Sequence, residues 1–215
     1  MKKLFFLVSI LMVLVVTPNI QATTVTVNRV AGYFSGNGGE FSVFPSTGPN
    51  FQSFCMELSE FISFGPTYNI VFNDRAINGS VGPVGDPLSV GVAWLYNEFR
   101  LGVLAGYDYT VPGRDVSAGM LQDAIWWLEG EAGDPANVFG NAAVTKFGSV
   151  ANAMANNNGQ YPVAILNLNN LNGTRAQDIL AAVSPIPEPA TMLLLGSGLI
   201  GLGVFTRRRY KRYKK

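Results

Sequence analysis

The chain has 215 residues, with 15 Lys and Arg against 14 Asp and Glu, one cysteine and no histidine. The missing histidine excludes Ser-His-Asp and Cys-His nucleophile activation and removes the commonest transition-metal ligand, so we expect no enzyme, no metal and no cofactor. The near-neutral total hides an acidic middle, since residues 23–186 hold six basic and thirteen acidic side chains, a net charge of about −7. A domain of that sign has no electrostatic reason to bind nucleic acid.

The first 22 residues have the charged start, apolar core and small cleavage residue of a secretory signal peptide. Two lysines precede a short apolar core from Leu4 to Val16, and Ala22 marks the expected cleavage point. We therefore expect Sec-type machinery to export residues 23–184 as one globular domain. That length can bury a core, and it must do so without an internal disulfide, because Cys55 is the only cysteine.

The first third of this domain has the apolar and polar alternation that is typical of β-strands. Residues 23–30 alternate β-branched and polar side chains, and a Gly-rich turn separates them from a second apolar segment at 40–44. The pattern predicts a third strand over residues 51–57, which carries Cys55, and a fourth over residues 68–72. The N-terminal part is therefore expected to be mostly β.

From Pro87 the apolar spacing changes to that of helices. A first helix is predicted to begin at Pro87, and a second to be capped by Asp115 or Ser117 and to end at Gly130. A weaker, Ala-rich pattern predicts a third helix over residues 141–155. These helices would interrupt an otherwise β-rich domain.

Strand character returns at residues 161–168. Residues 177–183 fit either a helix or a final strand, and we favour the strand, because it would lead straight into the proline-rich linker and close the sheet. The predicted fold class is therefore α+β. We expect a β-sandwich or a partial β-barrel with a helical insertion near residues 87–157, followed by a C-terminal transmembrane sorting helix.

Two sets of side chains raise the question of carbohydrate chemistry. The nearest approach to paired carboxylates is Glu57 with Glu60 and Glu129 with Glu131. These pairs do not fit the two carboxyls that a glycosidase holds across a sugar, so we interpret them as solvated charges. The tryptophans are Trp94, Trp126 and Trp127. Aromatic residues at helical spacing are more often part of the core than of a sugar-stacking surface. A secreted carbohydrate-binding or carbohydrate-active domain is therefore only the alternative function.

The C-terminal segment, residues 185–215, combines a Pro-Glu-Pro triplet, an uncharged apolar run and a basic cluster. These are Pro187, Glu188 and Pro189; Ala190 to Phe205; and a cluster that opens with Arg207, Arg208 and Arg209. In this order the segment resembles the PEP-CTERM sorting signal of Gram-negative bacteria that export exopolysaccharide. The resemblance implies a transient inner-membrane helix stopped by the arginines, cleavage by an exosortase, and a final location at the cell surface or in the extracellular matrix. An ordinary C-terminal membrane anchor is the alternative.

Two further segments resemble the two sequence blocks of the bacterial thioester domain. They are FCME at residues 54–57, an aromatic-Cys-aliphatic strand, and LQDAIW at residues 121–126, a helical apolar-Gln-x-Ala-aliphatic-Trp block. The resemblance implies that the side chains of Cys55 and Gln122 join in an internal thioester, which would make the protein a covalent adhesin for surface amines or exopolysaccharide. The other interpretation is that Cys55 is a small buried hydrophobe and Gln122 a helix-surface residue.

A thioester of this kind needs protection from water. On a helix, Ile125 and Trp126 lie three and four residues beyond Gln122, and therefore on the same face. We expect both side chains to cover the bond from the helix, and Phe51 or Phe54 to cover it from the strand.

Overall fold

A computed structural model of the protein describes residues 23–34, 36, 38–77 and 84–183. The predicted signal peptide, the Pro187-Glu188-Pro189 triplet, the transmembrane helix and the arginine cluster that begins at Arg207 lie outside these residues. Among the helices of the described part, none combines the length and the apolar character needed to span a bilayer.

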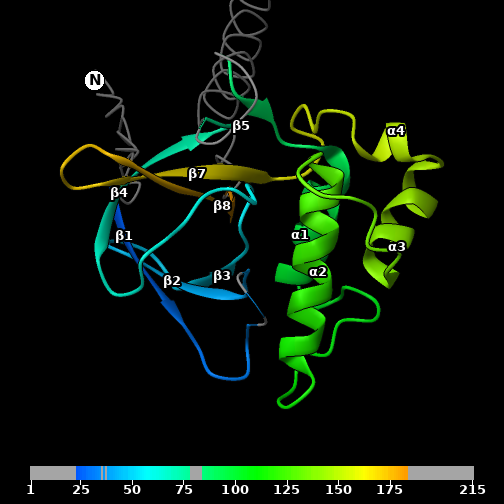
Figure 1. The fold of residues 1–215 in the computed structure, drawn as a ribbon, viewed down its shortest axis with the longest axis horizontal. Helices are drawn as coiled ribbons and strands as arrows, with labels where there is room; N and C mark the ends of the chain where they lie inside the picture. Colours follow the sequence, from blue (N-terminus) through cyan, green and yellow to red (C-terminus); the bar gives the residue numbers. More distant parts are fainter. Residues whose placement is uncertain (1–22, 35, 37, 78–83, 184–215) are drawn as a thin grey trace, which may run out of the picture.

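Six strands form one antiparallel sheet in the order β3-β2-β1-β4-β7-β8 (Figure 1). The strands are β1 (Thr24–Arg29), β2 (Phe41–Pro45), β3 (Phe51–Ser53), β4 (Thr67–Asn73), β7 (Val163–Asn170) and β8 (Arg175–Ala182). Two short strands, β5 (Arg75–Ala76) and β6 (Asp86–Pro87), form a separate pair. In β1, Val25 and Val27 are buried between half-buried polar neighbours, so the predicted alternation does turn one face of this strand to the core.

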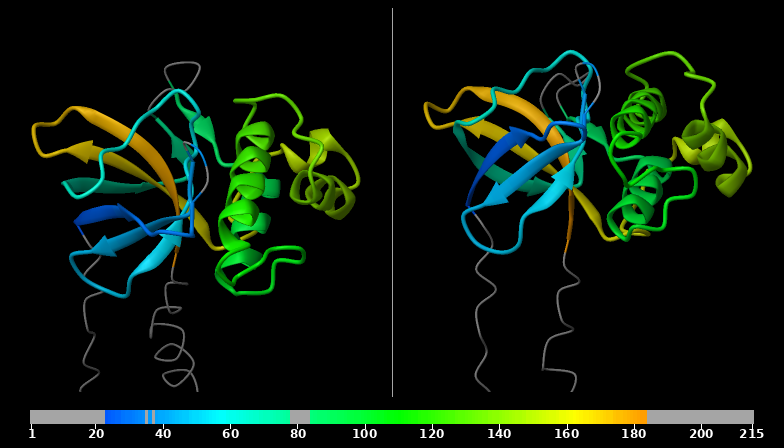
Figure 2. Two further views of the ribbon diagram at one scale, coloured as in Figure 1. Left: turned by 60° about the horizontal axis from the view of Figure 1, so that its bottom comes forward. Right: turned by 90° about the horizontal axis from the view of Figure 1, so that it is seen from below.

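The sheet curls until its two edges meet (Figure 2). Just beyond β3, the N–H of Met56 donates to the carbonyl oxygen of Asp178 at 2.9 Å. The N–H of Leu180 on β8 donates to the carbonyl oxygen of Phe54 at 3.1 Å. Between these two bonds, Cys55 forms an isolated β-bridge with β8. Cys55 therefore lies at the seam where the chain just beyond the edge strand β3 joins the other edge strand, β8.

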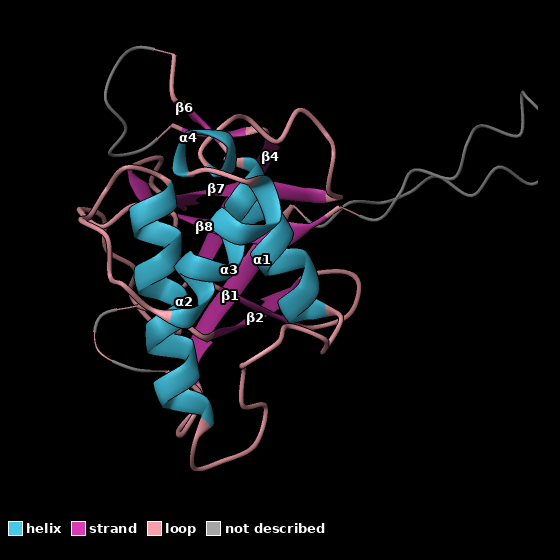
Figure 3. Cartoon of the chain, turned by 90° about the vertical axis from the view of Figure 1, so that its right-hand side faces the viewer, coloured by secondary structure: helices cyan, strands magenta, loops and turns pink. Residues whose placement is uncertain are grey.

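In the described part of the chain, four helices follow β6 and precede β7, and they pack together to one side of the sheet (Figures 1 and 3). They are α1 (Val90–Arg100), α2 (Arg114–Leu128), α3 (Val138–Phe147) and α4 (Val150–Ala153). Since β4 and β7 are direct neighbours in the sheet, the helices are an insertion between two paired strands. The prediction of an α+β fold with a helical insertion is confirmed.

The first helix does not begin where the sequence predicted. Pro87 lies in β6, paired with Arg75 of β5, and α1 begins only at Val90. Ser89 is the N-cap, because its hydroxyl accepts the N–H of Val92 at 3.2 Å. A proline can open a helix, but here the pairing with β5 keeps it extended.

The second helix has a different start from the predicted one. Its N-cap is Gly113, which offers no side-chain acceptor, so neither Asp115 nor Ser117 caps the helix. Ser117 lies inside the helix, where its hydroxyl accepts the N–H of Asp108 at 2.9 Å. At the other end Gly130 follows the helix with a φ of 82°, as the sequence predicted.

The single third helix that the sequence predicted is two helices. Gly148 has a φ of 81° and ends α3, and Ser149 caps the short α4 by accepting the N–H of Asn152. The Ala-rich composition hid this break, because the left-handed conformation of one glycine is enough to end a helix.

Two strand predictions had different outcomes. The ambiguous segment 177–183 is part of β8, so the choice of a strand was right. The third strand was predicted over 51–57 but ends at Ser53. The chain leaves β2 at that point, because residues 54–56 form their backbone hydrogen bonds with β8 instead.

The buried side chains of the described residues form two clusters. One lies between the sheet and the helices and includes Phe54, Leu121 and Ile125. The other lies within the curled sheet and includes Cys55, and Trp126 of α2 reaches into it. The Phe54 side chain thus faces the helices while that of the adjacent Cys55 faces the interior of the sheet, as expected for successive residues of extended chain.

Candidate functional site

Gln122 and Cys55, which are 67 residues apart in the sequence, are joined by two hydrogen bonds. The side-chain Oε1 of Gln122 accepts the backbone N–H of Cys55 at 2.9 Å, and its Nε2 donates to the carbonyl oxygen of Cys55 at 2.9 Å. Both residues are buried, with 3% of Cys55 and 1% of Gln122 exposed. Gln122 is therefore not a helix-surface residue, and its carboxamide is hydrogen-bonded to the backbone of the seam at the cysteine.

A third hydrogen bond reaches the same carboxamide from the chain that precedes β2. The backbone N–H of Gly39 donates to Oε1 of Gln122 at 3.0 Å. A Cβ atom on Gly38 would lie only 2.9 Å from Cδ and 3.0 Å from Oε1 of Gln122. Real Cβ atoms rarely approach other atoms so closely, so the absence of a side chain at Gly38 allows the carboxamide to occupy this position.

Gly39 is equally confined. A Cβ atom there would lie 2.7 Å from the carbonyl oxygen of Ser53 and 3.1 Å from Cα of Phe54. The sequence predicted only a turn for this Gly-rich segment, and not its contact with Gln122. A pair of glycines one residue before a strand is the signal, because glycine often marks a close approach of backbone to another group.

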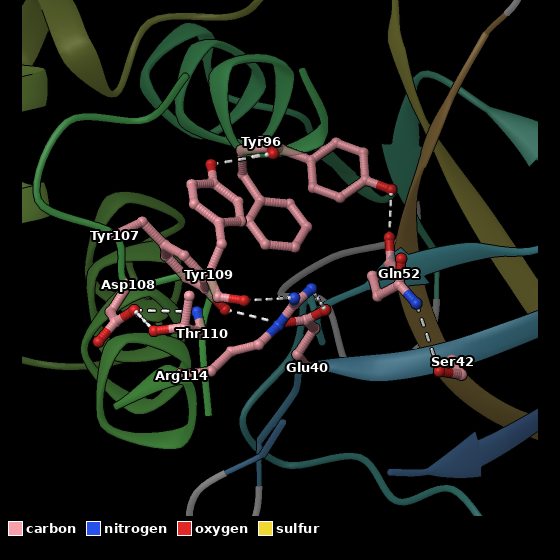
Figure 4. Close-up of polar contacts among 10 residues, drawn as sticks. Glu40, Ser42, Gln52, Tyr96, Tyr107, Asp108, Tyr109, Thr110 and Arg114 are labelled. Carbon is pink, nitrogen blue, oxygen red and sulfur yellow. Dashed lines mark hydrogen bonds and ion pairs between the residues drawn. The ribbon is translucent and has the colours of Figure 1, made fainter. Parts of the chain in front are cut away.

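The residue after Gly39 fixes this segment to helix α2 through a buried ion pair (Figure 4). Nη2 of Arg114 contacts Oε1 of Glu40 at 2.6 Å and Nε contacts Oε2 at 2.9 Å, while Glu40 is 0% exposed. The hydroxyl of Tyr107 donates to the same carboxylate at 2.7 Å. The guanidinium of Arg114 also lies 3.9 Å from the ring centroid of Tyr33. This bidentate Arg–carboxylate contact is of the strong type. The sequence alone does not indicate it, because the two residues are 74 positions apart.

Helix α2 is thus attached to one short segment at two points. Arg114 in its first turn holds Glu40, and Gln122, two turns further on, holds Gly39. These contacts fix both the position of the helix and the orientation of the carboxamide relative to Cys55.

Burial dominates the acid–base properties of the cysteine. It raises the pKa of the Cys55 thiol far above its ordinary value, and the carboxylate of Glu60 acts in the same direction. Cys55 is therefore a neutral thiol near neutral pH, and not an activated thiolate.

Three of the residues predicted to shield the bond lie on different sides of it. Trp126 shares the cluster within the sheet with Cys55 and is 9% exposed. Phe54 and Ile125 are both fully buried, but they belong to the cluster on the helical side, where the Phe54 ring packs edge-on against Phe99 with centroids 5.0 Å apart. Both faces of the seam are therefore closed to solvent.

The interpretation of the paired carboxylates as solvated charges is wrong for Glu57. Its side chain is 2% exposed, and burial, followed by the nearby Glu131 carboxylate, raises its pKa. Glu60 is half-buried and accepts the N–H of Asp178 at 3.1 Å, and burial raises its pKa to about 7. These groups lose solvent because the chain after Cys55 folds back against β8.

Glu129, at the end of α2, is likewise engaged and not simply solvated. Its carboxylate accepts the hydroxyl of Ser89 at 2.7 Å and the N–H of the same residue at 3.1 Å. Burial still raises its pKa to about 8. Within the described ranges, no group of three or more His, Cys, Asp or Glu side chains is arranged to hold a metal ion.

The comparison with known families identifies the C-terminal segment. Residues 185–209 match the model of the PEP-CTERM protein-sorting motif. The chain carries a PEP-CTERM sorting segment. This segment makes the protein an exported one, which reaches the membrane by Sec-type export, is associated with it through its C-terminus and is then processed by exosortase.

Comparisons for the rest of the chain are less informative. No curated protein sequence matches the chain. Among solved structures, the chain is similar to the N-terminal thioester domain of fibronectin-binding protein SfbI from Streptococcus pyogenes, with 14% identity and a TM-score of 0.44, over 79% of this chain and 97% of that one.

Proposed function

We propose that the exported domain is a covalent adhesin in which Sγ of Cys55 and Cδ of Gln122 join in an internal thioester. One observation supports this function above all others. The carboxamide of Gln122 is buried and bonded to both the N–H and the carbonyl oxygen of Cys55. A glutamine that only filled the core would be less favourable than an apolar residue, because the polar atoms of a buried amide all need hydrogen-bond partners.

Formation of the bond balances without a cofactor. Sγ of Cys55 attacks Cδ of Gln122, so that an Sγ–Cδ bond forms and the Cδ–Nε2 bond breaks. The leaving nitrogen takes the thiol proton and departs as ammonia. The product is an acyl group that an incoming amine or hydroxyl can attack, after which Cys55 is released as a thiol.

Burial of the site has two opposite effects on this chemistry. It excludes water, which would otherwise hydrolyse the thioester, and it raises the pKa of the Cys55 thiol, which slows the initial attack. A bond that forms once in the lifetime of each chain tolerates a slow first step. The site therefore suits a single covalent attachment and not repeated turnover.

The PEP-CTERM segment provides a location for such an attachment. On this proposal, processing by exosortase leaves the domain at the cell surface or in the extracellular matrix. The nucleophiles available there include surface amines and the hydroxyls of exopolysaccharide. Either would form a permanent bond with the acyl group of Gln122.

We also propose that the sheet is a partial β-barrel and not a β-sandwich. The hydrogen bonds between residues 54–56 and β8 close the sheet on itself. Cys55 then lies on the closing seam, where a covalent bond to α2 would fasten the helix across it.

The carbohydrate-binding alternative has less support. Trp126 and Trp127 are 9% and 8% exposed, and Trp94 is half-buried, with its ring packed edge-on against Phe147. No aromatic platform for a sugar is formed by these tryptophans.

Methylamine provides a direct chemical test of the proposal. Protein isolated from its native host should take up one methylamine at Gln122, because the amine opens the thioester at Cδ. Gln177 is an internal control, since it is also a buried amide, at 1% exposure, but contacts Glu57 and not Cys55. The Cys55→Ala variant should take up none. Uptake that persists in this variant, or that is equal at Gln177, would overturn the proposal.

A further inference from the structure

We infer that the backbone N–H groups of Gly39 and Cys55 form an oxyanion hole for the Cys55–Gln122 reaction, and that Glu40 and Arg114 are positioning residues for it. The inference rests on the proposed thioester and adds the groups that catalyse its formation and its opening. Both N–H groups donate to one atom, Oε1 of Gln122, at 3.0 and 2.9 Å.

The distances in the unreacted carboxamide are compatible with such a site. Oxyanion donors lie about 2.7–3.1 Å from the oxygen that becomes charged. Here the charge develops on an atom that both N–H groups already contact. Oε1 remains bonded to Cδ in the carboxamide, in the tetrahedral intermediate and in the thioester. The carbonyl oxygen of Cys55 accepts from Nε2 at the other end of the carboxamide. An inverted side chain would set its NH₂ group against two N–H donors, so the orientation of Oε1 is fixed.

The two donors are held in place before any reaction occurs. Cys55 is fixed by its bridge to β8, and Gly39 packs so closely on Ser53 and Phe54 that a side chain there would not fit. The Glu40–Arg114 ion pair anchors the residue next to Gly39 to the same helix that carries Gln122. Preorganised donors stabilise a developing charge without the cost of reorientation, and their effect is larger where water is excluded.

The opening reaction shows how the donors would act. The amine nitrogen attacks Cδ of Gln122, and the carbonyl electron pair moves to Oε1, which both N–H groups then stabilise. When this intermediate collapses, the Cδ–Sγ bond breaks, and Cys55 leaves with the electron pair and takes a proton from the amine nitrogen. Formation of the thioester passes through the same type of intermediate, with ammonia leaving in place of the thiol.

The substitution Gly38→Ala tests the assignment without removing either donor. Its Cβ would overlap Cγ of Gln122 and lie 2.9 Å from Cδ, so the carboxamide would be displaced from the two N–H groups. We expect the second-order rate of methylamine attack on protein from the native host to fall about 100-fold, the typical effect of losing oxyanion stabilisation. Gly133→Ala is the matched control, because a Cβ there meets no atom within 4 Å; its rate should equal that of the wild type.

An infrared measurement separates an effect on Oε1 from a general loss of structure. Hydrogen bonds to a thioester carbonyl oxygen lower its stretching frequency, so ¹³C labelling of the glutamine carboxamide carbon should reveal a low band in the wild type and a higher one in Gly38→Ala. A Gly38→Ala protein that melts like the control but has lost its thioester would also support the assignment. If the variant reacts at the wild-type rate with an unshifted band, the oxyanion hole is wrong although the thioester stands. A wild-type chain that never loses ammonia would end both proposals.

Discussion

The Arg114→Met variant should lose about 3–5 kcal/mol of the free energy of unfolding, as measured by denaturant titration, because it leaves a buried carboxylate without its cation. Glu40 is 0% exposed, and after the substitution only the Tyr107 hydroxyl would remain to donate to it among the contacts described. Most of this loss would come from the buried carboxylate that is left without a cation, and less from the net stabilisation that the ion pair gives the folded protein.

Two controls identify the cause of that loss. The double variant Glu40→Leu/Arg114→Met removes both charges and should regain most of the stability, because apolar replacement of a whole buried pair is often nearly neutral. Arg75→Met breaks the contact with Asp74, whose side chain is 74% exposed, and a hydrogen bond to the carbonyl oxygen of Val84, and should cost only a small fraction of what the single Arg114→Met variant loses. A single variant no less stable than Arg75→Met, or a double variant no better than the single, would contradict this explanation.

The melting temperature of the protein should fall by several degrees as the pH rises from about 5 to about 8. Burial raises the pKa values of Glu57, Glu60 and Glu129, the latter two to about 7 and about 8. The folded state therefore binds more protons than the unfolded state over this range, and stability must decrease with pH wherever that is so. The contribution is fully present below the ordinary pKa of glutamate and is lost as the pH passes the raised values.

Scanning calorimetry at a series of pH values measures this slope. Glu57→Gln should reduce it, because the amide is neutral at every pH and keeps the shape of the protonated acid. Asp134→Asn, on an exposed loop, should keep the wild-type slope. A melting temperature that rises over the same interval would show that these carboxyls are ionised in the folded protein at no cost.

The sequence was sufficient where local pattern decides structure. The alternation of Val25 and Val27 with polar residues predicted β1, and helical apolar spacing predicted α2. The burial of Gln122 on that helix is a finding of the structure. The predicted ends of helices and strands were wrong where pairing with a distant segment overrides the local preference for helix or strand. Pro87 is held in β6 by Arg75, and residues 54–56 leave β2 to bond with β8.

The candidate site was predictable only in part. The two residues proposed to react were found through sequence blocks, but the groups around them were not. Glu40 and Arg114 are separated by 74 residues and belong to no local pattern, so only the folded chain brings them together. The burial of Glu57 has the same origin, since a glutamate after a strand is solvated unless another segment covers it.

The intact mass of the protein recovered from its native host tests the central claim most directly. The account predicts a chain that begins near Thr23, lacks the segment from Ala190 onward, and is lighter than its remaining sequence by one ammonia, with a Cys55 that does not react with an alkylating reagent even after unfolding at mild pH. Cys55→Ala should restore the full sequence mass. A wild-type mass equal to the sequence, with Cys55 alkylated once the chain is unfolded, would contradict the thioester and return Cys55 and Gln122 to the packing of the core.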